Sequence, residues 1–195
     1  ITLCGQSEVM MGTGLLFELG DTTFGVEIGT DLMAAVPMCS AQAAEGAQLI
    51  LNLAADKEIR GAAQERRLAV SSCSRRLRAA YIYSSCGYGE STQDAVFGGH
   101  SLICENGEIF AETERFVQNN QLIYADIDLD ILTNERRRHT TFLSHLQKAE
   151  MHRLYRLITF DMEEPESLDN WCRPLTSAPF HPAADEVDEH CKDIF

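Results

Sequence analysis

Residues 48–54 form a nearly continuous apolar run, Gln-Leu-Ile-Leu-Asn-Leu-Ala, which constrains the fold more than any other feature of the sequence. A strand with this pattern is expected where both faces of a sheet are covered. A helical stretch follows over residues 61–80, and another strand over residues 81–86. Strand, helix and strand in succession predict βαβ units, and therefore an α/β fold with parallel strands.

Turn residues divide the rest of the chain. Two hairpins are predicted, over residues 15–28 and 101–112, the second around Asn-Gly, the strongest short hairpin signal. Pro37 and Ser40 open a short helix that is expected to run through Glu45. Three later elements complete the prediction: a strand over residues 121–130, a charged helix over 133–152 and a strand over 155–160.

The helix over residues 61–80 is expected to bury a face that carries Leu68, Cys73, Leu77 and Ala80. The arginines of this helix are expected to lie largely away from that buried face. Ion pairs within the chain are the expected use of these arginines, because the protein is acidic overall; an acidic partner or a phosphate is the alternative.

Composition limits the class of protein. The 195 residues suffice for one domain with a core, or for a large piece of a bigger one, and 45% are hydrophobic. A net charge of −14 argues against nucleic acid as a partner. No apolar run is long enough to span a bilayer, so no membrane partner is predicted. Seven scattered cysteines without metal-ligand spacing predict a reducing, cytoplasmic location and no metal site.

A candidate site lies where the strand over residues 24–28 ends in Gly29, Thr30 and Asp31, because ligands of α/β proteins bind at such strand ends. Alone, the pattern also fits an ordinary buried strand and turn. It resembles, however, the nucleophile strand of the nitrilase-like (carbon-nitrogen hydrolase) glutaminase domain of glutamine-dependent NAD synthetases, roughly Gly-Val-Glu-Ile-Cys-Glu-Asp-Leu-Trp. The matching residues are Gly25, Val26, Glu27, Ile28, Asp31 and Leu32. The family's nucleophilic Cys falls on Gly29 and the following Glu on Thr30.

Two further stretches carry the resemblance. Residues 87–100 are similar to the family's Gly-Glu-Gly-Glu-Ser-Thr-x-Asp-x-x-Phe-Gly-Gly-His block. We interpret Glu90, Ser91, Thr92 and Asp94 as a structural loop whose side chains satisfy backbone amides. Residues 52–56 resemble the family's Asn-Leu-Ser-Ala-Ser, whose last serine, near the bound glutamine, corresponds to Asp56.

The resemblance implies the C-terminal half of an α-β-β-α sandwich over residues 1–161. Residues 162–195 would be an acidic, Pro-containing linker toward a synthetase domain that lies outside these residues. The parent would be an NAD biosynthetic ligase with an amidohydrolase domain, taking ammonia from glutamine to amidate deamido-NAD with ATP and Mg. This chain would itself bind no cofactor. The remnant of the glutamine site would comprise Glu27, Gly29, Thr30, Asp31 and Asp56.

Amide hydrolysis needs a nucleophile, a base and stabilisation of the oxyanion. The resemblance assigns these roles to Cys, Glu and Lys, and it places the Glu and Lys upstream of Ile1. With Gly at position 29 we predict no intact catalytic residue and an inactive chain. Cys39 and Cys86 are the alternative nucleophiles, and each would need a lowered pKa and a nearby base.

Two other functions remain open at this stage. A degenerate glutaminase could be retained as a non-catalytic scaffold that organises a homo-oligomer of an ammonia-dependent synthetase. An unrelated domain could share only the architecture. Half a sandwich would expose one face of its sheet, so self-association is expected.

Overall fold

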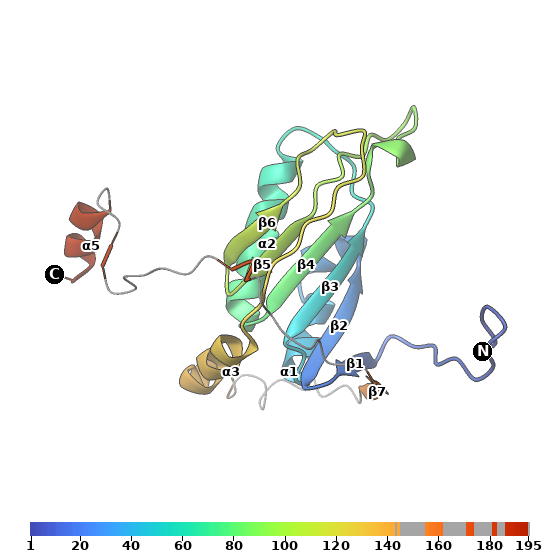
Figure 1. Ribbon diagram of the computed structural model, residues 1–195, viewed down its shortest axis with the longest axis horizontal. Coiled ribbons are helices and arrows are strands. Elements are labelled where there is room, and N and C mark those ends of the chain that lie inside the picture. The colour runs from blue at the N-terminus through green and yellow to red at the C-terminus, as the bar shows by residue number, and fades with distance from the viewer. Residues whose placement is uncertain (143, 145–154, 162–170, 174–180, 183–185, 195) are drawn as a thin grey trace.

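The computed structural model describes residues 1–142, 144, 155–161, 171–173, 181–182 and 186–194. Within them, seven strands form one mixed sheet in the order β6-β5-β4-β3-β2-β1-β7 (Figure 1). β2, β3 and β4 are parallel, as are β1 and β7, and the other neighbouring pairs are antiparallel. The strands are β1 (Leu15–Leu19), β2 (Thr22–Ile28), β3 (Leu49–Ala54), β4 (Ala80–Ser85), β5 (Leu102–Glu105), β6 (Glu108–Glu112) and β7 (Arg156–Phe160). The parallel β2-β3-β4 core confirms the α/β prediction.

Helices α1 (Met38–Ala44) and α2 (Ala62–Leu77) cover one face of this sheet (Figure 1). α3 (Leu129–Arg138) lies at the lower end of the sheet in that view. Two short 3₁₀ helices, η1 (Gly29–Met33) and η2 (Tyr88–Glu90), follow β2 and β4. The last described element is α5 (Val187–Ile194), whose residues are all exposed.

The core lies between the sheet and the two helices. Apolar side chains on alternate positions of the strands point at α1 and α2, as a period of two requires. The cluster includes Ile50, Tyr81, Tyr83, Leu102 and Cys104 from the strands, Cys39 and Ala43 from α1, and Val70, Cys73 and Leu77 from α2. The hairpins at Gly20 and at Asn106-Gly107 form as predicted, and both residues of the second turn have positive φ, at 48° and 92°.

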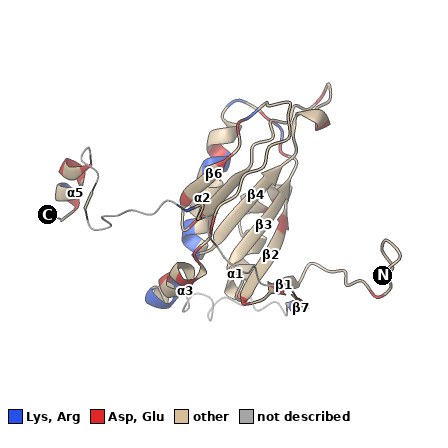
Figure 2. Cartoon of the chain, in the orientation of Figure 1, with Lys and Arg blue, Asp and Glu red and all other residues tan. Residues whose placement is uncertain are grey.

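The opposite face of the sheet is apolar and partly open. Registers align Val26 with Leu51, and Ile28 with Leu53, across β2 and β3. Ile28 and Leu53 are 62% and 58% exposed. Few charges lie on the central strands, whereas arginines gather on α2 and α3 (Figure 2). The expectation that residues 48–54 are covered on both faces is therefore wrong for the described chain, which supplies helices to one face only.

The buried face of α2 differs from the prediction. Leu68, expected inside, is 61% exposed, whereas Arg66, expected outside, is 3% exposed. The side chains that face the core follow a helical period: Arg66, Val70, Cys73, Ser74 and Leu77. The prediction placed the arginines largely away from the buried face, yet a buried arginine is tolerated when it is paired. Arg66 and Arg67 both form ion pairs within the chain.

The predicted strand over residues 121–130 is also wrong. Residues 119–128 have no regular secondary structure, and α3 begins at Leu129 rather than at Thr133. The Asp128 side chain caps α3 by accepting a hydrogen bond from Ile131 N at 2.9 Å. The helix leaves helical geometry at His139, with φ −91° and ψ 86°. The remainder of the predicted helix at 143 and 145–152 lies outside the described residues.

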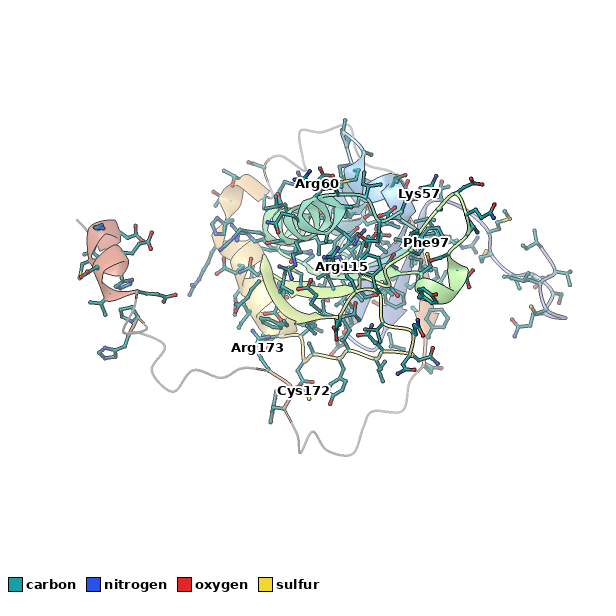
Figure 3. All side chains as sticks on the ribbon, turned by 90° about the horizontal axis from the view of Figure 1, so that it is seen from above. Lys57, Arg60, Phe97, Arg115, Cys172 and Arg173 are labelled. Carbon is teal, nitrogen blue, oxygen red and sulfur yellow. The ribbon has the colours of Figure 1, made fainter. Side chains whose placement is uncertain are left out.

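Part of the predicted linker contacts the sheet. Arg173 donates to both carboxylate oxygens of Glu105 at 2.7 Å, and its guanidinium lies 4.9 Å from the Phe110 ring centroid. Figure 3 shows Arg173 and Cys172 on the side of the sheet opposite α2. Residues 174–180, which include two of the linker prolines, lie outside the described part. The helix α5 was not predicted.

Candidate functional site

A pocket lies at the carboxyl ends of the parallel strands β2, β3 and β4. Its volume is about 610 Å³. Gly29 and Thr30 come from the exit of β2, Asp56 from the exit of β3 and Cys86 from the exit of β4. Among the described residues, the lining consists of Ile28, Gly29, Thr30, Leu53, Ala54, Ala55, Asp56, Ser84, Ser85 and Cys86. Three of the residues proposed from the sequence for the glutamine site, Gly29, Thr30 and Asp56, are thus brought together.

Gly29 occupies a turn that few other residues adopt readily. Its φ is +55°, in the left-handed region, where an L side chain is disfavoured by roughly 1–2 kcal/mol. Among the described residues, chain neighbours apart, no heavy atom lies within 4 Å of the position that a Cβ would take. Asn52 Nδ2 donates to Gly29 O at 3.2 Å and so fixes this turn from the neighbouring strand. A side chain at position 29 would therefore have free space.

Glu27 lies beneath the pocket rather than in it. It is 1% exposed, and its carboxylate accepts hydrogen bonds from Cys39 N at 2.5 Å and from the Tyr81 hydroxyl at 2.6 Å. Burial, followed by the charge of Glu27, raises the pKa of Tyr81, so the phenol stays protonated and donates. Glu27 thereby joins β2 to α1 and β4.

Asp31 is also outside the pocket. Its carboxylate accepts a hydrogen bond from Ile28 N at 3.2 Å, which holds the start of η1, and it lines a neighbouring cavity of about 530 Å³. The family resemblance assigned Glu27 and Asp31 to the remnant of the glutamine site. The alternation of side chains along β2 and the turn of η1 direct both away from the pocket.

Asp56 faces the pocket and is held by Tyr83. The Tyr83 hydroxyl donates to Asp56 Oδ2. Burial, reinforced by this hydrogen bond, raises the pKa of Tyr83, so the phenol keeps its proton. Tyr83 is 1% exposed and was not identified from the sequence. Its position two residues after Tyr81 on an alternating strand is the signal that could have placed both rings on the covered face.

Neither alternative thiol is an activated nucleophile. Cys39 lies in the first turn of α1; it is 0% exposed, and its Sγ is 3.1 Å from Cys73 Sγ. The contact with Cys73, together with burial, raises the pKa of Cys39. Cys86 lines the pocket, but burial and then the charge of Glu90 raise its pKa as well. Both sulfurs remain thiols, which are poor nucleophiles.

The structural loop predicted at residues 90–94 follows β4. Ser91 Oγ accepts a hydrogen bond from Phe97 N at 3.0 Å. Thr92 Oγ1 accepts from Asp94 N and Ala95 N, at 3.3 and 3.2 Å. These two hydroxyls bond to backbone amides in the way that the loop's composition predicts. Glu90 and Asp94 are exposed.

A buried polar network supports the strand ends from the α2 side. Arg66 Nη1 lies 2.8 Å from Glu58 Oε1 and 2.6 Å from His100 Nδ1. On its other side, His100 Nε2 lies 2.6 Å from Glu112 Oε1. Because the guanidinium can only donate, Nδ1 must accept, and the proton of a neutral His100 is therefore on Nε2. None of these residues was predicted from the sequence to belong to a network.

His100 predicts a specific pH dependence of stability. Burial lowers its pKa below the ordinary 6.5, so the unfolded chain binds a proton near pH 6.5 that the folded chain still excludes. The unfolding free energy should fall as pH drops below 6.5, by at most about 1.4 kcal/mol per pH unit from this one group. Urea unfolding at several pH values between 7.5 and 5.5 would measure this fall in the free energy of unfolding. His100→Gln should show a shallower fall over the same range, and an unchanged slope would contradict the assignment.

The described residues contain no group of three or more His, Cys, Asp or Glu side chains that could hold a metal ion. Likewise, no helix in the described part is long and apolar enough to cross a membrane. ATP, Mg and deamido-NAD were assigned by resemblance to a domain outside this chain, so their binding stays a prediction.

Comparison with known proteins shows which proteins this chain is related to. No protein-family model matches the chain. The glutamine-dependent NAD(+) synthetase of Mycobacterium tuberculosis H37Rv is 36% identical over 98% of the chain, which corresponds to 29% of that protein. That of Mycobacterium leprae shows the same identity and coverage. The chain is homologous to one segment of the glutamine-dependent NAD synthetases. It spans about 29% of the length of these curated relatives.

Solved structures show the fold of this segment. A glutamine-dependent NAD(+) synthetase from Cytophaga hutchinsonii superposes with a TM-score of 0.50 and 27% identity, over 58% of this chain and 18% of that one. Saccharomyces cerevisiae Nit3, a member of branch 10 of the nitrilase superfamily, superposes with a TM-score of 0.56 and 20% identity, over 71% of this chain and 50% of Nit3. The second likeness shows the fold alone, and it confirms the predicted nitrilase-like architecture.

Proposed function

We propose that this chain is part of an NAD synthetase whose nitrilase-like amidase domain no longer hydrolyses glutamine. The parent would amidate deamido-NAD with ATP and would take its nitrogen from free ammonium. The observation that carries the proposal is Gly29, which stands where the synthetase resemblance places the nucleophilic cysteine. The homology and the nitrilase-like fold support the parent's class, and the pocket at the strand ends supports the position of the former site.

The missing sulfur atom at position 29 should have a large effect on the rate of glutamine hydrolysis. Hydrolysing an unactivated amide requires a nucleophile stronger than water, positioned at the carbonyl carbon. Position 29 offers only hydrogens on its Cα, and Thr30 replaces the acidic residue that follows the nucleophile in the family. Removing the nucleophile from a catalytic unit typically lowers kcat by about 10⁶-fold. Glutamine hydrolysis by this domain should therefore be negligible beside ammonium-dependent synthesis.

A second candidate function is that of a scaffold. The face of the sheet opposite α1 and α2 is apolar, and Ile28 and Leu53 on it are more than half exposed, at 62% and 58%. A face of this kind is normally covered by another layer of structure. A domain retained for this contact, rather than for its chemistry, would organise a synthetase oligomer while keeping the nitrilase-like fold.

The test uses the full-length protein with deamido-NAD, ATP and Mg, supplied with either glutamine or ammonium. We expect NAD formation with ammonium, and neither NAD nor glutamate formation above background with glutamine. Glutamate released in step with NAD would overturn the proposal, because it would require a nucleophile that the described site does not provide.

A further inference from the structure

Two buried thiols face each other between α1 and α2. Cys39 on α1 and Cys73 on α2 are 0% and 2% exposed, and their Sγ atoms are 3.1 Å apart. The two residues are 34 positions apart in the chain, so only the packing of both helices on one face of the sheet brings them together (Figure 1). A disulfide has an S–S distance of about 2.05 Å, so the two sulfurs need to approach by only roughly 1 Å to form one.

The two thiols differ in their chemistry. Arg76, one turn after Cys73, is exposed, and its Nη2 lies 3.9 Å from Cys73 Sγ. The hydrogen bond from the Cys39 thiol lowers the pKa of Cys73 against the effect of burial, and the charge of Arg76 lowers it further. The same sulfur contact raises the pKa of Cys39, which keeps its proton. Cys73 therefore has thiolate character, and the thiolate is the reactive form of cysteine.

The position of Arg76 also bears on access to the pair. Because the guanidinium of an exposed residue reaches Cys73 Sγ, this sulfur lies at the edge of the core rather than at its centre. Cys104 in the same cluster shows the contrast: it is 0% exposed, and burial raises its pKa. A buried thiol with a raised pKa is typical of an inert, structural cysteine.

We propose that Cys39 and Cys73 are a redox-active pair, which a hydroperoxide oxidises to a disulfide that joins α1 to α2. The Cys73 thiolate attacks one oxygen of hydrogen peroxide, the O–O bond breaks, and Cys73 becomes a sulfenic acid. The hydroxide that leaves takes up the proton that the thiol had lost. The Cys39 sulfur then attacks the Cys73 sulfur, the S–O bond breaks, and the hydroxyl leaves as water with the Cys39 proton. Two thiols and one hydrogen peroxide thus give one disulfide and two waters.

The disulfide would reinforce the support of β2. The backbone N–H of Cys39 donates to the buried Glu27 carboxylate at 2.5 Å, and the Tyr81 hydroxyl donates to the same carboxylate. α1 is therefore already tied to β2 and β4, and the new bond would add α2. Closing a loop of this length makes the folded state harder to unfold. The proposal does not depend on the loss of glutamine hydrolysis, because neither sulfur lines the pocket at the strand ends.

Mass spectrometry of the full-length protein treated with hydrogen peroxide tests the proposal without any substitution. Free thiols are blocked with iodoacetamide during unfolding, and the peptides are measured without reduction. We expect a linked Cys39–Cys73 peptide, about 2 Da lighter than its two reduced parts, that forms at least about tenfold faster than Cys104 is oxidised. Dithiothreitol should restore both thiols by exchange. Oxidation of the pair no faster than Cys104, or linkage to other cysteines, would overturn the proposal.

Four variants test the order of the two steps. Cys39→Ser should accumulate a sulfenic acid at Cys73, which dimedone traps, whereas Cys73→Ser should leave Cys39 unmodified. Arg76→Gln should slow oxidation by about two- to fivefold, because the positive charge beside the thiolate is lost. Arg75→Gln removes the same charge from the neighbouring exposed position and should leave the rate unchanged. Dimedone labelling of Cys39, or equal rates in the two arginine variants, would refute Cys73 as the attacking thiolate.

Discussion

Glutamine hydrolysis is expected to rise by orders of magnitude when Gly29→Cys and Thr30→Glu are combined in the full-length protein. The turn at position 29 is already formed, and a Cβ there would have no heavy atom of the described residues within 4 Å, chain neighbours apart. The left-handed φ of +55° adds a strain of roughly 1–2 kcal/mol, which a folded domain tolerates. Since a missing nucleophile accounts for about 10⁶ in rate, even partial recovery should be measurable as glutamate release.

The matched control is Gly29→Ala combined with Thr30→Glu. It introduces the same Cβ, the same backbone strain and the same carboxylate, but no thiol. Hydrolysis should stay at background in this control while the fold is retained, as judged by its thermal midpoint. If the cysteine variant were folded and yet no faster than the alanine variant, the nucleophile would not be the only catalytic group that is missing, and the scaffold function would be favoured.

The elements that position the site follow from local sequence. The apolar run of β3 and the strand–helix–strand order predicted parallel strands, and parallel strands necessarily bring their carboxyl ends to one edge. Gly29, Thr30 and Asp56 could therefore be grouped from the sequence alone, because each lies just beyond the end of a strand. Asn-Gly likewise predicted the β5–β6 hairpin from the backbone conformation that this turn requires.

Side chains whose partners are distant in sequence were harder to place. Glu27 adjoins Gly29 in the chain, but its carboxylate accepts a hydrogen bond from the Tyr81 hydroxyl, 54 residues away. The arginines of α2 were predicted to lie largely away from its buried face, and burying a charge without a partner is costly. The partners of Arg66, Glu58 and His100, lie 8 and 34 residues away, and only the fold brings them together.

Arg66→Met should destabilise the protein by about 3–5 kcal/mol, the usual loss when one member of a buried ion pair is removed. The side chains of Arg66 and Glu58 are 4% and 5% exposed. Without Arg66, the Glu58 carboxylate keeps only a 3.5 Å contact with Arg115, which is 42% exposed, and His100 Nδ1 loses its donor. Denaturant unfolding monitored by circular dichroism would measure the change in free energy.

Arg67→Met provides the control on the next residue of the same helix. Arg67 also forms an ion pair, with Glu112 at 2.6 Å, but its side chain is 48% exposed, so water compensates for much of the loss. We expect a change of about 1 kcal/mol or less for this variant. The two substitutions alter charge and side-chain type equally, and they differ in burial and in the His100 contact that Arg66 makes. Equal destabilisation would mean that water reaches Glu58 and Arg66, and that the strand ends are not supported by a buried network.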